Sequence, residues 1–198
     1  MDYLPETPKE LSNVAADRAR HLVSAQRAVQ AEKEGYDAFC PFGTRDYGIA
    51  DGRKLVKTMP VVGQADSCLL YCGLLGRPFG SVIYMPEMED WYRECAAEAG
   101  LAGQMVHTTS IGFPNKQYPE RRAELLARFV TCAREAKAKG AELMGLVAMS
   151  ICPVEYSAKE LSGACGIPVL DALACQVAMA EWWHRTGLPP TLLRYPRG

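Results

Sequence analysis

The chain has 198 residues, of which 48% are hydrophobic and 23% charged, and its formal net charge is -1. A charge so close to zero, without a basic stripe of interleaved aromatic residues, argues against nucleic acid or an anionic membrane as the main partner. The polar start of the chain is unlike a secretory signal, and no apolar run reaches the roughly 18 residues that span a bilayer, so we expect a soluble, cytoplasmic protein.

The first half of the chain alternates helical and strand-like patterns. A helix is predicted over residues 8–34, where Gly35 ends it, and the apolar run 36–42 is typical of a buried strand. A loop bracketed by glycines follows over residues 43–48. The pattern then predicts a short helix, a buried strand and an apolar helix, over residues 50–57, 59–63 and 65–76.

The second half continues the alternation. Its predicted elements are, in chain order, strand 79–84, helix 87–99, strand 105–111, helix 119–139, strand 143–151, helix 155–164, strand 167–170 and helix 173–184. Strands that alternate with helices favour an α/β fold with mostly parallel sheets flanked by helices.

One pattern occurs twice in the chain. Each copy runs through a glycine, an acidic residue, a strand, a loop, a helix, a Pro-Val strand and an apolar helix, and the copies end at Cys68 and Cys175. The distance from Gly35 to Pro60 is 25 positions, and that from Gly140 to Pro168 is 28. The repeat predicts two pseudo-symmetric lobes, residues 1–78 and 79–172, with residues 173–198 packing back on the first.

The repeat also predicts where a ligand binds. Parallel α/β units bind ligands beyond the carboxyl ends of their strands. The loops after Phe42, Val62, Ile151 and Leu170 are therefore expected to face one cleft shared by the lobes. A cleft of this kind suits near-symmetric chemistry on two faces of a small-molecule substrate.

Several polar residues follow the predicted strands and are candidates for substrate binding. The loop with Gly43 and Thr44 can offer backbone N–H groups to a substrate oxygen, and its alternative role is a tight turn. The other candidates, some of which can equally be helix N-caps, are Gln64, Asp66, Ser67 and Asp171. The eight cysteines contain no CxxC pair and the three histidines are far apart in sequence, so no metal site is predicted.

Dispersed segments in a fixed order carry a family resemblance: EGYDAF (34–39), MPVVG (59–63), LLGRPFGSVIY (74–84), KGAELMGLV (139–147) and GIPVLDALA (166–174). With these segments the chain resembles the aspartate/glutamate/hydantoin racemase superfamily. The resemblance implies an enzyme without a cofactor that places one cysteine on each side of a carbon acid. One thiolate removes the proton, and the other thiol returns it from the opposite face.

The chain departs from that pattern at the cysteines. The resemblance puts a cysteine eight residues after the glycine that opens each half, and here those positions are Gly43 and Ala148. The neighbouring candidates for the acid/base are Cys152, Ser150 and Cys40. Cys152 is expected at the end of a buried strand and just before a helix N-terminus, which favours a thiolate. For Cys152 and Cys40 the alternative role is that of a buried side chain in the hydrophobic core.

A second departure concerns the first lobe. The resemblance implies an opening strand-helix-strand portion with an Asn-bearing turn, and the sequence MDYLPETPKE does not match it. The first lobe is then trimmed or completed by another subunit. Because such relatives assemble as oligomers, a homo-oligomer is expected.

The leading interpretation is a cofactor-independent isomerase, a racemase or epimerase. It would transfer a proton next to a carbonyl on a small carboxylate, amino-acid derivative or hydantoin. Two alternatives stay open. One is a one-thiol decarboxylase of the arylmalonate decarboxylase type, which Gly43 would fit, and the other is a small-molecule-binding relative without catalysis.

Overall fold

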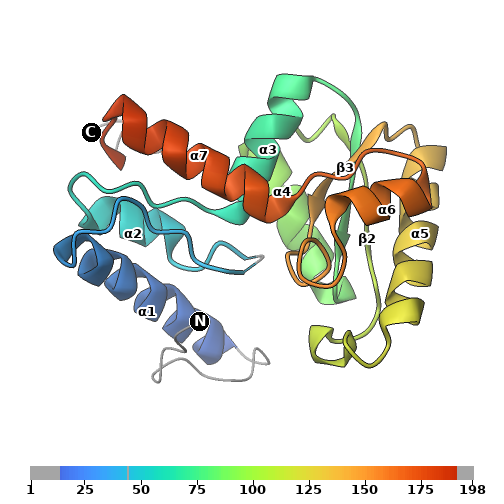
Figure 1. Ribbon diagram of the computed structural model, residues 1–198, viewed down its shortest axis with the longest axis horizontal. Coiled ribbons are helices and arrows are strands. Elements are labelled where there is room, and N and C mark those ends of the chain that lie inside the picture. Colours follow the sequence, from blue (N-terminus) through green and yellow to red (C-terminus); the bar gives the residue numbers. More distant parts are fainter. Residues whose placement is uncertain (1–13, 44, 191–198) are drawn as a thin grey trace. The chain divides into compact units, whose positions relative to one another are not determined.

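The computed structural model describes residues 14–43 and 45–190 (Figure 1). These residues divide into two compact units, of which the first takes residues 14–41, 46–63 and 177–190 and the second residues 42–43, 45 and 64–176. Each unit has a hydrophobic core of its own.

A parallel three-stranded sheet forms the centre of the second unit. Its strands are β1 (Phe79–Ile83), β2 (Met105–Ser110) and β3 (Leu143–Val147), in the order β2-β1-β3. A parallel bridge between Met144 and Val169 adds a short fourth segment beside β3. The predicted α/β fold with a mostly parallel sheet is therefore confirmed.

Helices cover both faces of this sheet. Figure 1 shows α5 (Arg122–Ala138) and α6 (Ala158–Cys165) on one side, with α3 (Gln64–Leu75) and α4 (Glu89–Glu98) on the other. Two short 3-10 turns, Pro86–Met88 and Asn115–Gln117, lie in the connections. Every residue of β1 and β3 is buried, as expected for parallel strands between two helical layers.

Two glycines set how closely the helices approach the sheet. A Cβ atom at Gly80 of β1 would lie 2.6 Å from the Cβ atom of Ala136 in α5. A Cβ atom at Gly145 of β3 would collide with the thiol of Cys72 in α3. Neither position has room for a side chain, so each glycine brings one helical layer against the strands.

The first unit contains α1 (Val14–Lys33), α2 (Ile49–Leu55) and the later part of α7 (Ala172–Thr186), which begins in the second unit. A parallel bridge joins Phe39 and Val61. The buried Arg53 donates its Nε–H to the Val61 carbonyl at 2.8 Å, and its guanidinium lies 5.2 Å from the centre of the Trp183 ring. This cation–π contact fastens α2 to the last helix.

The structure corrects several predicted boundaries. The predicted strands 36–42, 59–63 and 167–170 form single bridges, and the strand predicted over 143–151 ends at Val147, with turns over 149–155. The helix predicted from residue 155 begins at Ala158, because Ser157 and Glu160 form a capping box there. The helix predicted from residue 119 begins at Arg122. In the described part of the chain, every helix is too short or too polar to cross a bilayer.

Candidate functional site

Candidate residues gather at the carboxyl edge of the second unit's sheet. The strands are parallel, so their carboxyl ends meet at one edge, where α/β proteins bind small molecules. The turn after β3 carries Ser150 and Cys152, and Asp171 follows the bridged segment beside β3. These three predicted residues therefore come from neighbouring segments of one edge.

Cys152 is a buried thiol rather than an exposed one. Its backbone N–H donates to the Ala148 carbonyl at 3.0 Å, and its thiol donates toward the Leu170 carbonyl at 3.9 Å. Burial raises the pKa of the Cys152 thiol to about 12, and the nearby Asp171 and Cys175 add to the rise. The thiol is thus held in its protonated form at neutral pH.

The expected stabilisation of a Cys152 thiolate by a helix N-terminus is not found in the structure. The residue lies within the turns that follow β3, and the next helix begins six residues later, at Ala158. The effect of a helix dipole falls off within the first turn, so α6 does not favour a thiolate there.

Asp171 combines the two roles that its sequence position left open. Its Oδ1 accepts a hydrogen bond from the backbone N–H of Ala174 at 3.0 Å, which caps the start of α7. The same carboxylate raises the pKa of the Cys152 thiol by repulsion of the thiolate. Asp171 therefore belongs to the helix cap and to the surroundings of the thiol.

Ser150 offers a hydroxyl group at this edge. Its Oγ is buried and makes no hydrogen bond to any other described residue. A buried hydroxyl without a partner costs free energy, which a bound polar group can recover. The Ser150 hydroxyl is therefore available for a hydrogen bond to a substrate oxygen or nitrogen.

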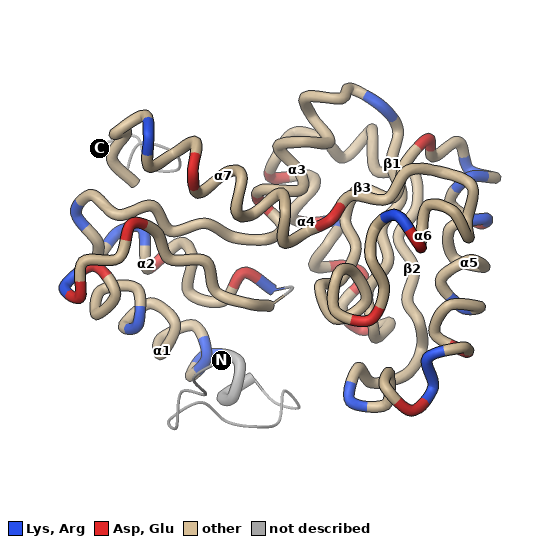
Figure 2. Tube along the Cα trace, in the orientation of Figure 1, with Lys and Arg blue, Asp and Glu red and all other residues tan. Residues whose placement is uncertain are grey.

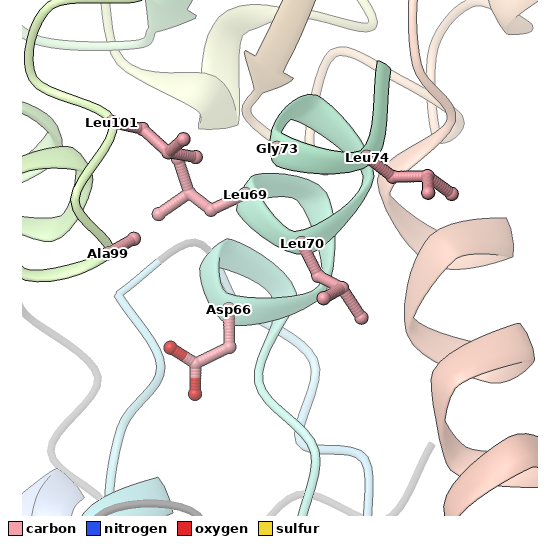
Figure 3. Close-up of a pocket in the computed structure, with 7 residues that line it drawn as sticks. All are labelled: Asp66, Leu69, Leu70, Gly73, Leu74, Ala99 and Leu101. Atoms are coloured by element: carbon pink, nitrogen blue, oxygen red, sulfur yellow. The ribbon is translucent and has the colours of Figure 1, made fainter. Parts of the chain in front are cut away.

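The residues at the start of α3 separate into two environments. Gln64 is buried and donates from Nε2 to the Val147 carbonyl at 2.9 Å, which places it against the end of β3, and Ser67 is buried as well. Asp66 is half-buried and lines an open groove of about 400 Å³ (Figure 3). The other lining residues are apolar or glycine: Leu69, Leu70, Gly73, Leu74, Ala99 and Leu101. Asp66 is the one ionisable side chain that lines this groove, so the groove offers few groups for acid–base chemistry.

The candidates from the first half lie in different units. Gly43 belongs to the loop grouped with the second unit, and its φ of 151° is a conformation that favours glycine. Thr44 lies outside the described residues. Cys40 belongs to the first unit, half-buried beside Val62 and Trp183, and burial raises the pKa of its thiol to about 11.

Two cysteines at the same edge were not singled out by the sequence analysis as functional. Cys175 lies in the first turn of α7, and Cys68 lies in α3. The Cys68 thiol donates a hydrogen bond to the Cys175 sulfur, which lowers the pKa of Cys175. The repeat is the feature of the sequence that could have identified these two cysteines, because each copy ends at one of them.

A cluster of metal-binding side chains is absent from the described part of this site. Among the residues that the structure describes, no group of three or more His, Cys, Asp or Glu side chains is arranged to hold a metal ion. Figure 2 shows acidic and basic residues interspersed along the trace. The polar and titratable groups that the predicted residues bring to this edge are the thiol of Cys152, the hydroxyl of Ser150 and the carboxylate of Asp171.

Known proteins resemble this chain in sequence and in fold. The family model described as Asp/Glu/Hydantoin racemase matches residues 2–180. A hydantoin racemase from Pseudomonas sp. (strain NS671) is 28% identical over 155 residues, which are 77% of this chain and 60% of that protein. The chain thus spans about three fifths of the length of that relative.

Solved structures share the fold. An allantoin racemase from Klebsiella pneumoniae has a TM-score of 0.76 at 18% identity, over 96% of this chain and 77% of that one. Arylmalonate decarboxylase has a TM-score of 0.60 at 16% identity, over 86% of this chain and 78% of that one.

Proposed function

Because the chain belongs to the Asp/Glu/hydantoin racemase family, we propose that it is a cofactor-independent isomerase that moves a proton at a carbon next to a carbonyl. The proposed substrate class is a small ring amide of the hydantoin type, since the curated relatives are hydantoin racemases. The observation that carries the proposal is the thiol–carboxylate pair of Cys152 and Asp171 at the carboxyl edge of the sheet.

The environment of Cys152 favours the role of a proton donor. A thiol whose pKa is raised to about 12 keeps its proton at neutral pH and can deliver it to a carbanion or enolate. The thiolate left behind lies beside Asp171, where repulsion makes it strongly basic, so it can take the proton from the carbon next to the carbonyl of a further substrate molecule and return to the thiol. The Ser150 hydroxyl is the proposed hydrogen-bond partner of the substrate's polar atoms.

A second candidate function is decarboxylation followed by protonation on one face. Gly43 stands where the resemblance puts the first thiol, and Cys40 is half-buried against a hydrophobic cluster of the first unit. One protonated thiol is sufficient for a reaction that begins with loss of carbon dioxide and ends with delivery of one proton. The similarity in fold to arylmalonate decarboxylase is compatible with this chemistry.

The test is deuterium incorporation in D2O, followed by NMR and chiral chromatography, across hydantoins, amino acids and substituted malonates. Exchange with loss of optical purity supports the isomerase, whereas carbon dioxide release with one deuterated enantiomer supports the second candidate. Absence of exchange and turnover on all compounds contradicts both, and ligand-induced thermal shifts would then favour a binding role.

Matched variants test the proposed role of Cys152. We expect Cys152→Ala to lower the rate of exchange roughly 10²- to 10⁴-fold, the usual contribution of a general acid or base. Cys165→Ala removes another buried thiol of the same unit, one that donates toward the Ile167 carbonyl, and should leave the rate within about threefold. Equal rates in the two variants would assign the proton transfer to another residue.

A further inference from the structure

The two cysteines that end the copies of the repeat lie in contact with each other. Cys68 and Cys175 belong to the same buried cluster, together with Ala65 and Ala172 at the starts of their helices. The Cys68 thiol donates a hydrogen bond to the Cys175 sulfur. A direct sulfur–sulfur contact between two helices is thus present in the core of the second unit.

The fold itself produces this pair. Cys68 lies eight residues after Pro60, and Cys175 lies seven residues after Pro168. Both therefore occupy the beginning of the helix that follows a Pro-Val segment, in α3 and in α7. The two copies thus put a cysteine within one position of the same place in their last helices, and there the two thiols meet.

The two thiols are not equivalent. The hydrogen bond from Cys68 lowers the pKa of Cys175, against the opposing effects of burial and of Asp171. Cys175 is 7% exposed, whereas Cys68 is fully buried. The neighbouring Cys72 and Cys152 each have a pKa raised to about 12 by burial. Cys175 is accordingly the thiol of this group that ionises and meets a small reagent first.

We propose that Cys68 and Cys175 form a redox-active dithiol that a small hydroperoxide converts to an intramolecular disulfide, with Cys175 attacked first and Cys68 resolving. Reactive cysteines of this kind combine an ionisable thiol with an adjacent resolving one. The dithiol lies outside the chemistry proposed above, which uses Cys152, so either proposal can fail alone.

The chemistry balances with the hydroperoxide as oxidant. The Cys175 thiolate attacks one peroxide oxygen, an S–O bond forms, the O–O bond breaks, and the departing hydroxide takes a proton to become water. The Cys68 sulfur then attacks the Cys175 sulfur, the S–S bond forms and the S–O bond breaks. The second hydroxide leaves as water with the Cys68 proton. Overall, two thiols and one hydrogen peroxide give one disulfide and two waters.

The test is peptide mapping of the full chain after reduction and treatment with about one equivalent of hydrogen peroxide. The Cys72→Ala/Cys165→Ala variant leaves Cys68 and Cys175 as the lone cysteines of their tryptic peptides, which begin at Thr58 and Glu160. We expect a cross-linked pair of these peptides that dithiothreitol separates. Fragment spectra of the parent protein should localise the same bond, which guards against an effect of the background substitutions.

Single variants separate the two roles. Cys68→Ser should let Cys175 accumulate as a sulfenic acid that dimedone traps. Cys175→Ser should slow consumption of the first equivalent of peroxide at least tenfold. A Cys152–Cys175 bond would overturn the proposal. So would direct passage of Cys175 to the sulfinic acid in the parent protein, or an unchanged rate in the Cys175→Ser variant.

Discussion

At the residue scale, the environment of Cys152 decides its chemistry. Its thiol donates toward the Leu170 backbone carbonyl, and the side chains of Asp171 and Cys175 lie close enough to act on its charge. Burial of the sulfur and the negative charge beside it both oppose the thiolate. We therefore expect a thiol that resists alkylation, although it lies at the carboxyl edge of the sheet, where α/β proteins usually bind ligands.

Iodoacetamide reacts with thiolates, so its rate measures this effect. At pH 8 we expect Cys152 in the folded protein to react roughly a thousandfold more slowly than a free cysteine, given a pKa raised to about 12. The tryptic peptide of residues 140–159 contains Cys152 as its one cysteine, so mass spectrometry reads its labelling without ambiguity.

The same peptide labelled in urea provides the unfolded control, which should react at the ordinary rate. Labelling of the folded protein with a midpoint below pH 8 would contradict the expectation and indicate an activated thiol.

The ends of the predicted strands indicated the place of some candidate residues and not of others. They predicted Ser150, Cys152 and Asp171, because a residue after a parallel strand lies at the binding edge whatever its surroundings. They could not predict the burial of Cys152, which depends on contacts across the fold. Cys68 and Cys175 were not predicted as a pair, although each ends one copy of the repeat, because a cysteine in an apolar helix is usually a small buried hydrophobe.

At the scale of elements, the apolar runs predicted which segments are buried more accurately than they predicted which segments pair as strands. The runs 79–84 and 105–111 became β1 and β2 almost as predicted. The run 59–63 is equally buried but pairs through Val61 alone, with Phe39. An apolar run indicates that a segment is buried. Strand pairing also requires a partner segment in register, and the run alone does not specify that partner.

The contact between α5 and β1 gives a stability test at this scale. In Gly80→Ala the new methyl group would lie 2.6 Å from the Ala136 Cβ atom, so helix and strand must move apart. We expect the free energy of unfolding to fall by about 1–3 kcal/mol, as in other overpacked cores. Urea denaturation followed by circular dichroism measures the change.

Gly103 provides the matched control for Gly80. It is exposed, and a Cβ atom there would have no neighbour within 4 Å, so Gly103→Ala should change the free energy of unfolding by less than about 1 kcal/mol. Similar losses in both variants would argue against close packing as the cause.

At the scale of the whole molecule, buried thiols couple stability to alkaline pH. Burial raises the pKa of Cys72 and of Cys152 to about 12, whereas a thiol in the unfolded chain ionises near about 8.5. The stability that each protonated thiol contributes is therefore complete below pH ~8.5 and is lost as pH rises toward the folded pKa.

We expect the free energy of unfolding to fall between pH 8.5 and 10, with a limiting slope of about 1.4 kcal/mol per pH unit for each thiol. Urea denaturation at a series of pH values under reducing conditions measures the slope. The Cys72→Ala/Cys152→Ala variant should show a shallower one, and an identical slope would place the titration at other groups.

The first unit is assembled from pieces that are far apart in the chain. Its segments 14–41 and 46–63 contribute α1 and α2, but Trp183, which is fully buried in the same unit, arrives after more than a hundred intervening residues. Those intervening residues form nearly all of the second unit. During synthesis the second unit can complete its local contacts first, since its sequence is almost continuous, while the first must await α7. Loops of this length close slowly, so the order of emergence from the ribosome favours the parallel sheet as the early folding nucleus. The helices α1 and α2 lack their contact with Trp183 until α7 has been synthesised.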